Sequence, residues 1–289
     1  MRYTVKYNQN QLRDYSSLFS RSEALSWFKK DFRSINYKIK RYDENWHNYK
    51  NATYLDYLKY VYHILESQYQ NEYILKNSFL NEWLIQEIGS HSSQIFNEFR
   101  VGNSIADLVM FNGSSKLFEI KTEYDSDSRL PVQLYNYQKA FNQIFLIVPV
   151  SKLKLYEKYN ERIGLISFDG NRIDKFRLTR KAENNLNVDP SVIMQILHTE
   201  EYKSVVKLYY GKLPKMTSFN QFNICQNLIN KIPTKKLNTL FINQMKNRDF
   251  NNNISSRYYK EFNQLSLALK LNKPEKKIMI DNLKTLVKV

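Results

Sequence analysis

Apolar positions along this chain follow two different spacings, which divide it into three segments. Residues 1–70 carry apolar side chains at helical spacing, as in the stripe formed by Leu55, Leu58, Val61, Tyr62 and Leu65. Helical spacing returns in residues 183–289, with helices expected at 190–212, 217–231, 234–247 and 256–271. Residues 71–182 differ, because short apolar runs rich in β-branched residues replace the stripes. Two helical ends are therefore expected around a central segment.

The central segment has the pattern of a β-sheet with helices packed on it. Its short apolar runs predict strands at 95–101, 104–112, 116–124, 144–149, 163–168 and 172–180. Asn112-Gly113-Ser114-Ser115 predicts a hairpin between the second and third strands. A helix expected over 130–141 leads into the fourth strand, as in a parallel crossover. The expected fold class is α/β, with a central mixed sheet flanked by helices and helical extensions at both ends.

The expected hairpin carries two carboxylates and an ammonium. Asp107 lies on its first strand, and Glu119 and Lys121 lie on its second. Alternate residues of a strand share a face, so Glu119 and Lys121 point the same way. The hairpin register then brings Asp107 within about one residue of Glu119. We expect the three side chains to converge on one patch of the sheet.

These residue types are suited to metal-assisted phosphodiester hydrolysis. Mg²⁺ and Mn²⁺ take oxygen ligands, so Asp107 and Glu119 are the expected metal ligands. A bound cation lowers the pKa of its water, and Lys121 can stabilise charge on phosphate oxygens. The alternative is a solvated strand face with an incidental Glu-Lys pair. Apolar neighbours of Asp107 on both faces of its strand argue against that alternative.

A Gln-x-x-x-Tyr pair follows the two strands. Gln133 and Tyr137 are four residues apart in the expected helix and so share one of its faces. With the acid and the Glu-x-Lys before it, the arrangement resembles the PD-(D/E)xK, or restriction-endonuclease-like, nuclease superfamily. More narrowly, it resembles the Gln-x-x-x-Tyr branch that includes RecB-type nucleases and phage lambda exonuclease.

The resemblance implies a role for each matching residue. Asp107 and Glu119 would be metal ligands, Lys121 the catalytic lysine, and Gln133 and Tyr137 contacts to the site. Residues 71–149 are also similar to a bacterial family within that superfamily, through Asn71-Glu72-Tyr73-Ile74-Leu75-Lys76-Asn77, Phe99-Arg100-Val101-Gly102 and Arg129-Leu130-Pro131. Glu72 would then be the further catalytic acid on a helix before the sheet. Ala106 stands where many members have proline, which affects no catalytic position. The nuclease core is expected over 71–182.

The positive charge is concentrated outside residues 51–150, the segment that holds the candidate catalytic residues. The formal net charge is +16, and it divides into +6 for residues 1–50, −4 for 51–150 and +14 for 151–289. Basic flanks around an acidic metal site suit a polyanionic substrate, although A/T-rich coding also produces Lys-rich sequences. The candidate nucleic-acid contacts are Arg129, Lys235, Lys236, Lys246 and Arg257.

Composition excludes several other classes of protein. A single cysteine, Cys225, rules out an intramolecular disulfide framework and a cysteine-based zinc site. The expected localisation is cytoplasmic, with no membrane association, because no apolar run reaches the length of a membrane span. No P-loop or dinucleotide fingerprint is present, so ATP-driven chemistry would need a partner.

The expected function is a Mg²⁺- or Mn²⁺-dependent nuclease that acts on DNA, or on RNA, in phage defence or DNA repair. One alternative is a catalytically inactive nucleic-acid-binding module that kept the fold. Another is a subunit of a defence or mobile-element complex with protein partners. A protein partner and a homo-oligomer both stay open at this point.

Overall fold

The computed structural model describes residues 6–48, 51–87, 93–248 and 257–288. Contacts group the chain into two compact units. The first combines Met1–Glu87, Asp169–Lys175 and Phe250–Val289, and the second combines Ile88–Phe168 and Phe176–Asp249. This grouping crosses the segment boundaries expected at residues 70 and 182.

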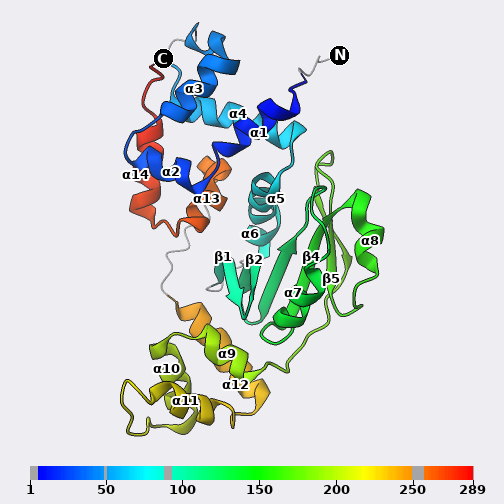
Figure 1. The fold of residues 1–289 in the computed structure, drawn as a ribbon, viewed down its shortest axis with the longest axis vertical. Helices are drawn as coiled ribbons and strands as arrows, with labels where there is room; N and C mark the ends of the chain where they lie inside the picture. Colours follow the sequence, from blue (N-terminus) through cyan, green and yellow to red (C-terminus); the bar gives the residue numbers. More distant parts are fainter. Residues whose placement is uncertain (1–5, 49–50, 88–92, 249–256, 289) are drawn as a thin grey trace. The chain divides into compact units, whose positions relative to one another are not determined.

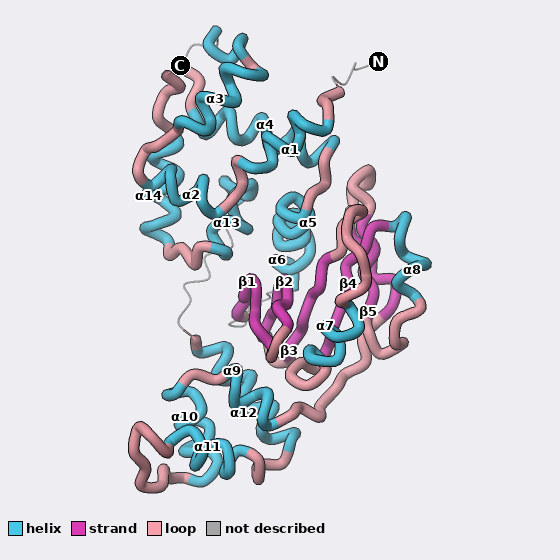
Figure 2. Tube along the Cα trace, viewed as in Figure 1, coloured by secondary structure: helices cyan, strands magenta, loops and turns pink. Residues whose placement is uncertain are grey.

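The second unit is built on a six-stranded mixed sheet (Figures 1 and 2). Its strands are β1 (Gln94–Val101), β2 (Ser104–Phe111), β3 (Ser115–Ile120), β4 (Gln143–Pro149), β5 (Gly164–Phe168) and β6 (Phe176–Arg180), and they neighbour one another in that order. The β3–β4 and β4–β5 pairs are parallel, and the other pairs are antiparallel. The predicted mixed sheet with flanking helices and helical terminal regions is confirmed.

Turn chemistry sets where the strands around the site begin and end. Gly102 and Gly113 have positive φ angles of 57° and 105°, which glycine adopts without a steric penalty, in the turns before β2 and β3. The prediction that β3 reaches residue 124 was wrong, since it ends at Ile120. The Asp125 carboxylate accepts hydrogen bonds from the backbone N and the hydroxyl of Thr122, both at 2.7 Å. These bonds close a turn that stops the strand.

Helices of the second unit cover the sheet and form a separate cluster. They are α7 (Leu130–Tyr137), η3 (Val150–Lys152), α8 (Leu153–Glu157), α9 (Pro190–Ile196), α10 (Thr199–Tyr210), α11 (Gln221–Ile229) and α12 (Thr234–Asn247). Helix α7 packs on β2, and the Phe241 ring of α12 meets that of Phe111 on β2 at 5.6 Å between centroids. The single helix predicted over 190–212 was wrong. Extended backbone at Leu197 and His198 divides it into α9 and α10.

The first unit is helical. Its elements are α1 (Gln9–Ser17), α2 (Arg21–Phe28), α3 (Arg33–Tyr42), η1 (Glu44–Asn48), α4 (Tyr54–Gln68), α5 (Glu72–Phe79), η2 (Leu80–Leu84), α6 (Ile85–Glu87), η4 (Arg257–Phe262), α13 (Asn263–Ala268) and α14 (Lys273–Leu283). Its core joins Trp27 and Leu58 to Phe262 and Met279, residues far apart in the sequence. The 256–271 helix predicted from the sequence is replaced by a 3-10 turn and the short α13.

No helix within the described ranges combines the length and apolar composition needed to cross a membrane.

Lys276 is a buried lysine of the first unit. The Lys276 side chain is 7% exposed and donates a 2.6 Å hydrogen bond to Oδ1 of Asn263. Burial lowers the pKa of Lys276 to about 8, from an ordinary value of 10.5. The folded protein therefore releases this proton at a lower pH than the unfolded chain does.

Replacing Lys276 with methionine should remove a component of the pH dependence of stability. Between pH 8 and 10.5 the unfolded chain binds more protons at this position, so the parent's free energy of unfolding rises with pH. Relative to Lys276→Met, the rise should reach about 3 kcal/mol. Urea unfolding of both proteins across this range measures it, with exposed Lys277→Met as control. If the free energy of unfolding changes equally with pH in the parent and in Lys276→Met, the lowered pKa of Lys276 is contradicted.

Candidate active site

The β2–β3 register brings two carboxylates together. Leu108 pairs with Phe118, so Asp107 and Glu119 are the next residues along the two antiparallel strands. The Asp107 carboxylate accepts a 2.7 Å hydrogen bond from the backbone N of Ile120. Residues opposite each other in such a pair share a face of the sheet. The predicted convergence of Asp107 and Glu119 is what the structure shows.

Lys121 joins this pair from the end of β3. Its Nζ donates to Oε1 of Glu119 at 2.9 Å and to Oε1 of Gln133 at 3.3 Å. The Lys121 backbone N donates to the carbonyl of Ile147 at 2.9 Å, which continues the pairing of β3 with β4 past Ile120. Glu119 and Lys121 are both buried, and a buried charge requires a partner of this kind.

Helix α7 supplies two further donors to Glu119. Gln133 donates from Nε2 to Oε1 of Glu119 at 2.8 Å. The Tyr137 hydroxyl lies 2.9 Å from Oε2 of Glu119 and 2.8 Å from the carbonyl of Ile105, and its single proton can serve either acceptor. The i, i+4 spacing of Gln133 and Tyr137 places both on the face of α7 that meets the sheet.

Burial controls the protonation of the site. Removal of Glu119 from water raises the pKa of its carboxyl, and the nearby charge of Asp107 raises it further. The ammonium of Lys121 acts in the opposite direction. Burial also raises the pKa of Tyr137, with a further contribution from Glu119, so the phenol stays a neutral donor.

The donor set fits a hard divalent cation. Asp107 and Glu119 provide two carboxylates close enough for the charge of one to raise the pKa of the other. A cation between them would relieve that repulsion, and Mg²⁺ is commonly held by one or two carboxylates together with waters and substrate phosphate. Within the described part of the chain, no group of three or more His, Cys, Asp or Glu side chains forms a metal cluster. Any cation here would depend on water and substrate for its remaining ligands.

Glu72, the further acid expected from the resemblance, belongs to the first unit. It lies in the first turn of α5 and forms a 2.5 Å ion pair with Lys76. None of the hydrogen bonds around Glu119 involves it. Its catalytic role stays a prediction.

The predicted nucleic-acid contacts occupy several places. Arg129 precedes α7 with an exposed side chain, and Lys235 and Lys236 are exposed in the first turn of α12. Lys246 is half-buried in the last turn of that helix. Arg257 begins η4 in the first unit, and its side chain lies outside the described residues.

The sequence did not single out Asn136, which also fixes α7. Its Nδ2 donates to the Ser104 hydroxyl, at the start of β2, at 2.9 Å. This bond ties the helix that carries Gln133 and Tyr137 to the strand that carries Asp107. In the sequence, the only indication that Asn136 faces the sheet was its position three residues after Gln133 in the expected helix.

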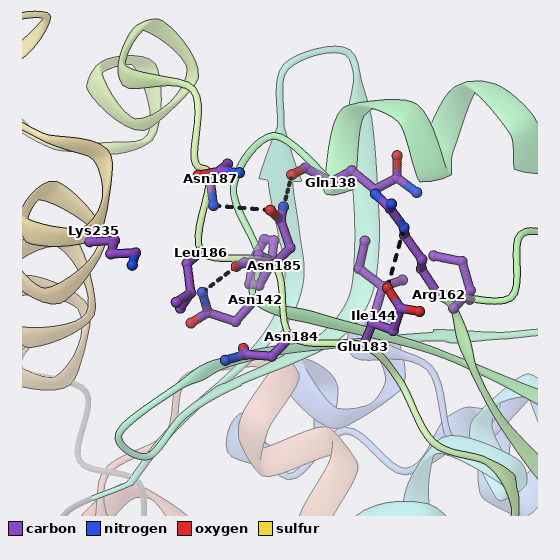
Figure 3. Close-up of a pocket in the computed structure, with 12 residues that line it drawn as sticks. Gln138, Asn142, Ile144, Arg162, Glu183, Asn184, Asn185, Leu186, Asn187 and Lys235 are labelled. Atoms are coloured by element: carbon purple, nitrogen blue, oxygen red, sulfur yellow. Dashed lines mark hydrogen bonds and ion pairs between the residues drawn. The ribbon is translucent and has the colours of Figure 1, made fainter.

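A cavity of about 630 Å³ opens elsewhere in the second unit (Figure 3). Ile144, near the start of β4, and Ile163, just before β5, contribute to its lining, whereas Lys121 follows the end of β3. Because β3, β4 and β5 are parallel, this cavity and the acidic site lie at opposite ends of the strands. Its walls are held by hydrogen bonds from Asn142 Nδ2 to the Asn185 carbonyl and from Asn185 Nδ2 to the Gln138 carbonyl, both at 2.7 Å.

Lys235 is among the residues that line this cavity, and Asp107, Glu119 and Lys121 are not.

Comparisons relate the chain to known proteins. A family profile described as "Bacteriophage P4 protein cII" matches residues 66–286. Protein cII of Enterobacteria phage P4 is 26% identical over 175 residues, and the match covers 58% of this chain and 64% of that protein. The chain thus spans less than two thirds of that relative's length. A solved structure, described as "SPO1766 protein of unknown function from Silicibacter pomeroyi", is 15% identical and covers 48% of this chain and 94% of its own. Its TM-score of 0.31 is too low to bear on fold or function.

Asp107→Asn should lower the pKa of the Glu119 carboxyl. The amide oxygen can still accept from the Ile120 backbone N, so the geometry is kept while the like charge is removed. A ¹³C NMR titration of the glutamate carboxyls measures the change. Asp127→Asn is the control, because Asp127 interacts with Tyr159 and Lys158 instead. An unchanged Glu119 pKa in Asp107→Asn would contradict the close approach of the two carboxylates.

Proposed function

The chain belongs to the family of bacteriophage P4 protein cII, and we propose that it is a metal-dependent nuclease that hydrolyses phosphodiester bonds in DNA. The observation that supports this most is the contact set around Glu119. An acid from β2, a lysine just after β3, and an amide and a phenol from α7 surround the buried carboxylate of Glu119 on β3. The resemblance to the Gln-x-x-x-Tyr branch of the PD-(D/E)xK superfamily rests on these same five residues.

Each side chain has a task in this proposal. Asp107 and Glu119 would hold Mg²⁺ or Mn²⁺, which when bound supplies a water of lowered pKa. Gln133 and Tyr137 donate to Glu119 and fix the direction of its oxygens. Lys121, 2.9 Å from Glu119, can donate instead to a phosphate oxygen as negative charge develops there. The buried setting strengthens these electrostatic interactions relative to water.

A second candidate function is binding without turnover, in a complex of a phage or other mobile element. It is favoured by the family, whose profile is described by the name of a phage protein. Against it stands the completeness of the site, because a decayed nuclease is expected to lose Lys121 or one acid. We place the protein in the cytoplasm under either function, with phage defence or DNA repair as its setting under the first.

Incubation with nucleic acid separates the two functions. Linear duplex, circular duplex and single-stranded DNA, with RNA alongside, should be incubated with Mg²⁺, Mn²⁺ or EDTA. Cleavage that needs the metal supports the nuclease. Binding without cleavage of any substrate, under all metal conditions, would favour the binding function.

Lys121→Ala should separate catalysis from binding. The change removes a donor to the phosphate but leaves both carboxylates, so cleavage should slow by about 10²–10³-fold. DNA affinity should stay near that of the parent, because the residues proposed to bind the phosphate backbone, such as Lys235 and Lys236, lie elsewhere in the chain. Asp107→Asn should instead weaken metal binding, since an amide is a poorer Mg²⁺ ligand than a carboxylate. Circular dichroism checks folding, because Lys121 is buried.

If folded Lys121→Ala cleaves DNA as fast as the parent at saturating Mg²⁺, the proposed role of Lys121 is excluded.

Charge reversal on α12 should weaken DNA binding without affecting the metal. Lys235, Lys236 and Lys246 contribute positive charge that would release counterions from the phosphate backbone. Their combined change to glutamate should lower affinity and reduce the slope of log affinity against log salt by about one unit per lost contact. Fluorescence anisotropy at several salt concentrations measures the slope, and calorimetric Mg²⁺ titration is the control. Binding by the parent that does not depend on salt would instead favour a protein partner.

A further inference from the structure

Exposed aromatic rings gather on α10, on α11 and on the loop between them. The Phe219 side chain is 97% exposed, and Phe222, Tyr210 and Tyr209 are 40%, 38% and 36% exposed. The lysines of the same stretch are Lys207, Lys212 and Lys215, all of them exposed. We call these seven residues the α10–α11 surface. Figure 1 shows its helices, coloured yellow, within the helical cluster of the second unit.

The backbone that carries the most exposed ring of this surface is held in a turn. Phe219 lies in a turn in which the Thr217 backbone N donates to Oδ1 of Asn220 at 2.7 Å. The Gln221 backbone N donates to the Thr217 carbonyl at 3.0 Å, and Gln221 Nε2 donates to the Ser218 carbonyl at 3.2 Å. This turn keeps a large apolar ring in solvent, where its exposure is unfavourable unless something covers it.

The charge of this region points to a polyanion. From Tyr202 to Arg248 the chain carries no Asp or Glu, while it carries Lys203, Lys207, Lys212, Lys215, Lys231, Lys235, Lys236, Lys246 and Arg248. Two of these cations are paired with acids just before the stretch, Lys203 with Glu200 at 3.0 Å and Arg248 with Glu201 at 2.5 Å. Across the described residues, no ion pair is found for the three lysines of the α10–α11 surface.

We propose that the α10–α11 surface binds single-stranded nucleic acid. The lysines would contact phosphates, and unpaired bases would stack on Phe219 and its neighbouring rings. A duplex presents phosphates equally well but keeps the faces of its bases inside the stack, so exposed rings add nothing to duplex binding. An acidic protein could also cover exposed rings, so it is the competing occupant that the titrations below are designed to detect. The inference deepens the proposed nuclease function, on which it rests for its biological sense, by naming single strands as the form of substrate held.

Anisotropy titrations of the full chain in EDTA test this surface without cleavage. The probes are oligo(dT), an abasic oligonucleotide of equal length and charge, and a duplex. Phe219→Ala should weaken oligo(dT) binding about tenfold, which lies within the range expected for loss of one stacked base, and leave abasic binding unchanged. Lys207→Gln with Lys215→Gln should weaken both single-stranded probes and lower the salt slope. Tyr37→Ala, whose ring is 57% exposed in the first unit, is the matched control and should change nothing.

Several outcomes would overturn the inference. One is equal affinity of Phe219→Ala and parent for oligo(dT), and another is equal affinity of the parent for the abasic probe and oligo(dT). Failure of the parent to bind any nucleic acid would also overturn it and leave a protein as the occupant to test. Cleavage is assayed separately, with Mg²⁺. If the parent binds single strands but cuts no substrate, this inference stands and the proposed nuclease function is overturned. If the parent cuts duplex DNA but does not bind single strands, the nuclease function stands and this inference is overturned.

Discussion

The second unit depends on how one buried carboxylate is kept satisfied. Glu119 lies in β3 away from water, where an unpartnered charge would be strongly unfavourable. An ammonium, an amide and a phenol donate to it, and two of these come from a helix that follows β3 in sequence. The position of α7 against β2 and β3 is therefore coupled to the chemistry of the site, because moving the helix would remove two donors. Structural support and candidate catalysis use the same atoms.

The crossover from β3 through α7 to β4 also separates two polar regions. Parallel strands place their carboxyl ends together, and there Lys121 and its partners lie. At the amino ends, buried Asn142 binds the hydroxyl and backbone N of Ser115 and the carbonyl of Asn185. These bonds anchor the segment that leads to α9, so the helical cluster is joined to the sheet at the end away from the acids. A substrate held by that cluster would have to span the length of the strands to reach the site.

Sequence alone predicted the parts that depend on short-range rules. Alternation and a glycine turn fix the β2–β3 register, and these two local signals were enough to place Asp107 near Glu119. The break at Leu197 was missed, although four polar residues, 198–201, interrupt the apolar spacing there and the Glu201 carboxylate accepts from the backbone N of His198 at the start of α10. Helix α14 was missed, although Asn272 and Glu275 form a capping box that marks its start.

The first unit could be predicted least of all. Contacts such as that between the rings of Trp27 and Phe262, 6.0 Å apart, join residues with no local relation in the sequence. Helical spacing shows that each segment has an apolar face, but it does not say which distant segment covers that face. The pairing of the early helices with α13 and α14 therefore lay beyond any argument from periodicity.

The first unit combines early and late segments of the chain, and this has a consequence for its synthesis on the ribosome. Its core includes Leu12 and Trp27 but also Phe262, Met279 and Leu283. All six strands of the second unit have emerged long before residue 262 is made, so that sheet can close while the chain is still growing. Part of the apolar surface of the early helices, such as the Trp27 ring that contacts Phe262, stays uncovered until a segment far later in the chain is made. A nascent chain of this protein therefore presents a finished sheet and an unfinished helical core, and chaperone demand should fall on the core.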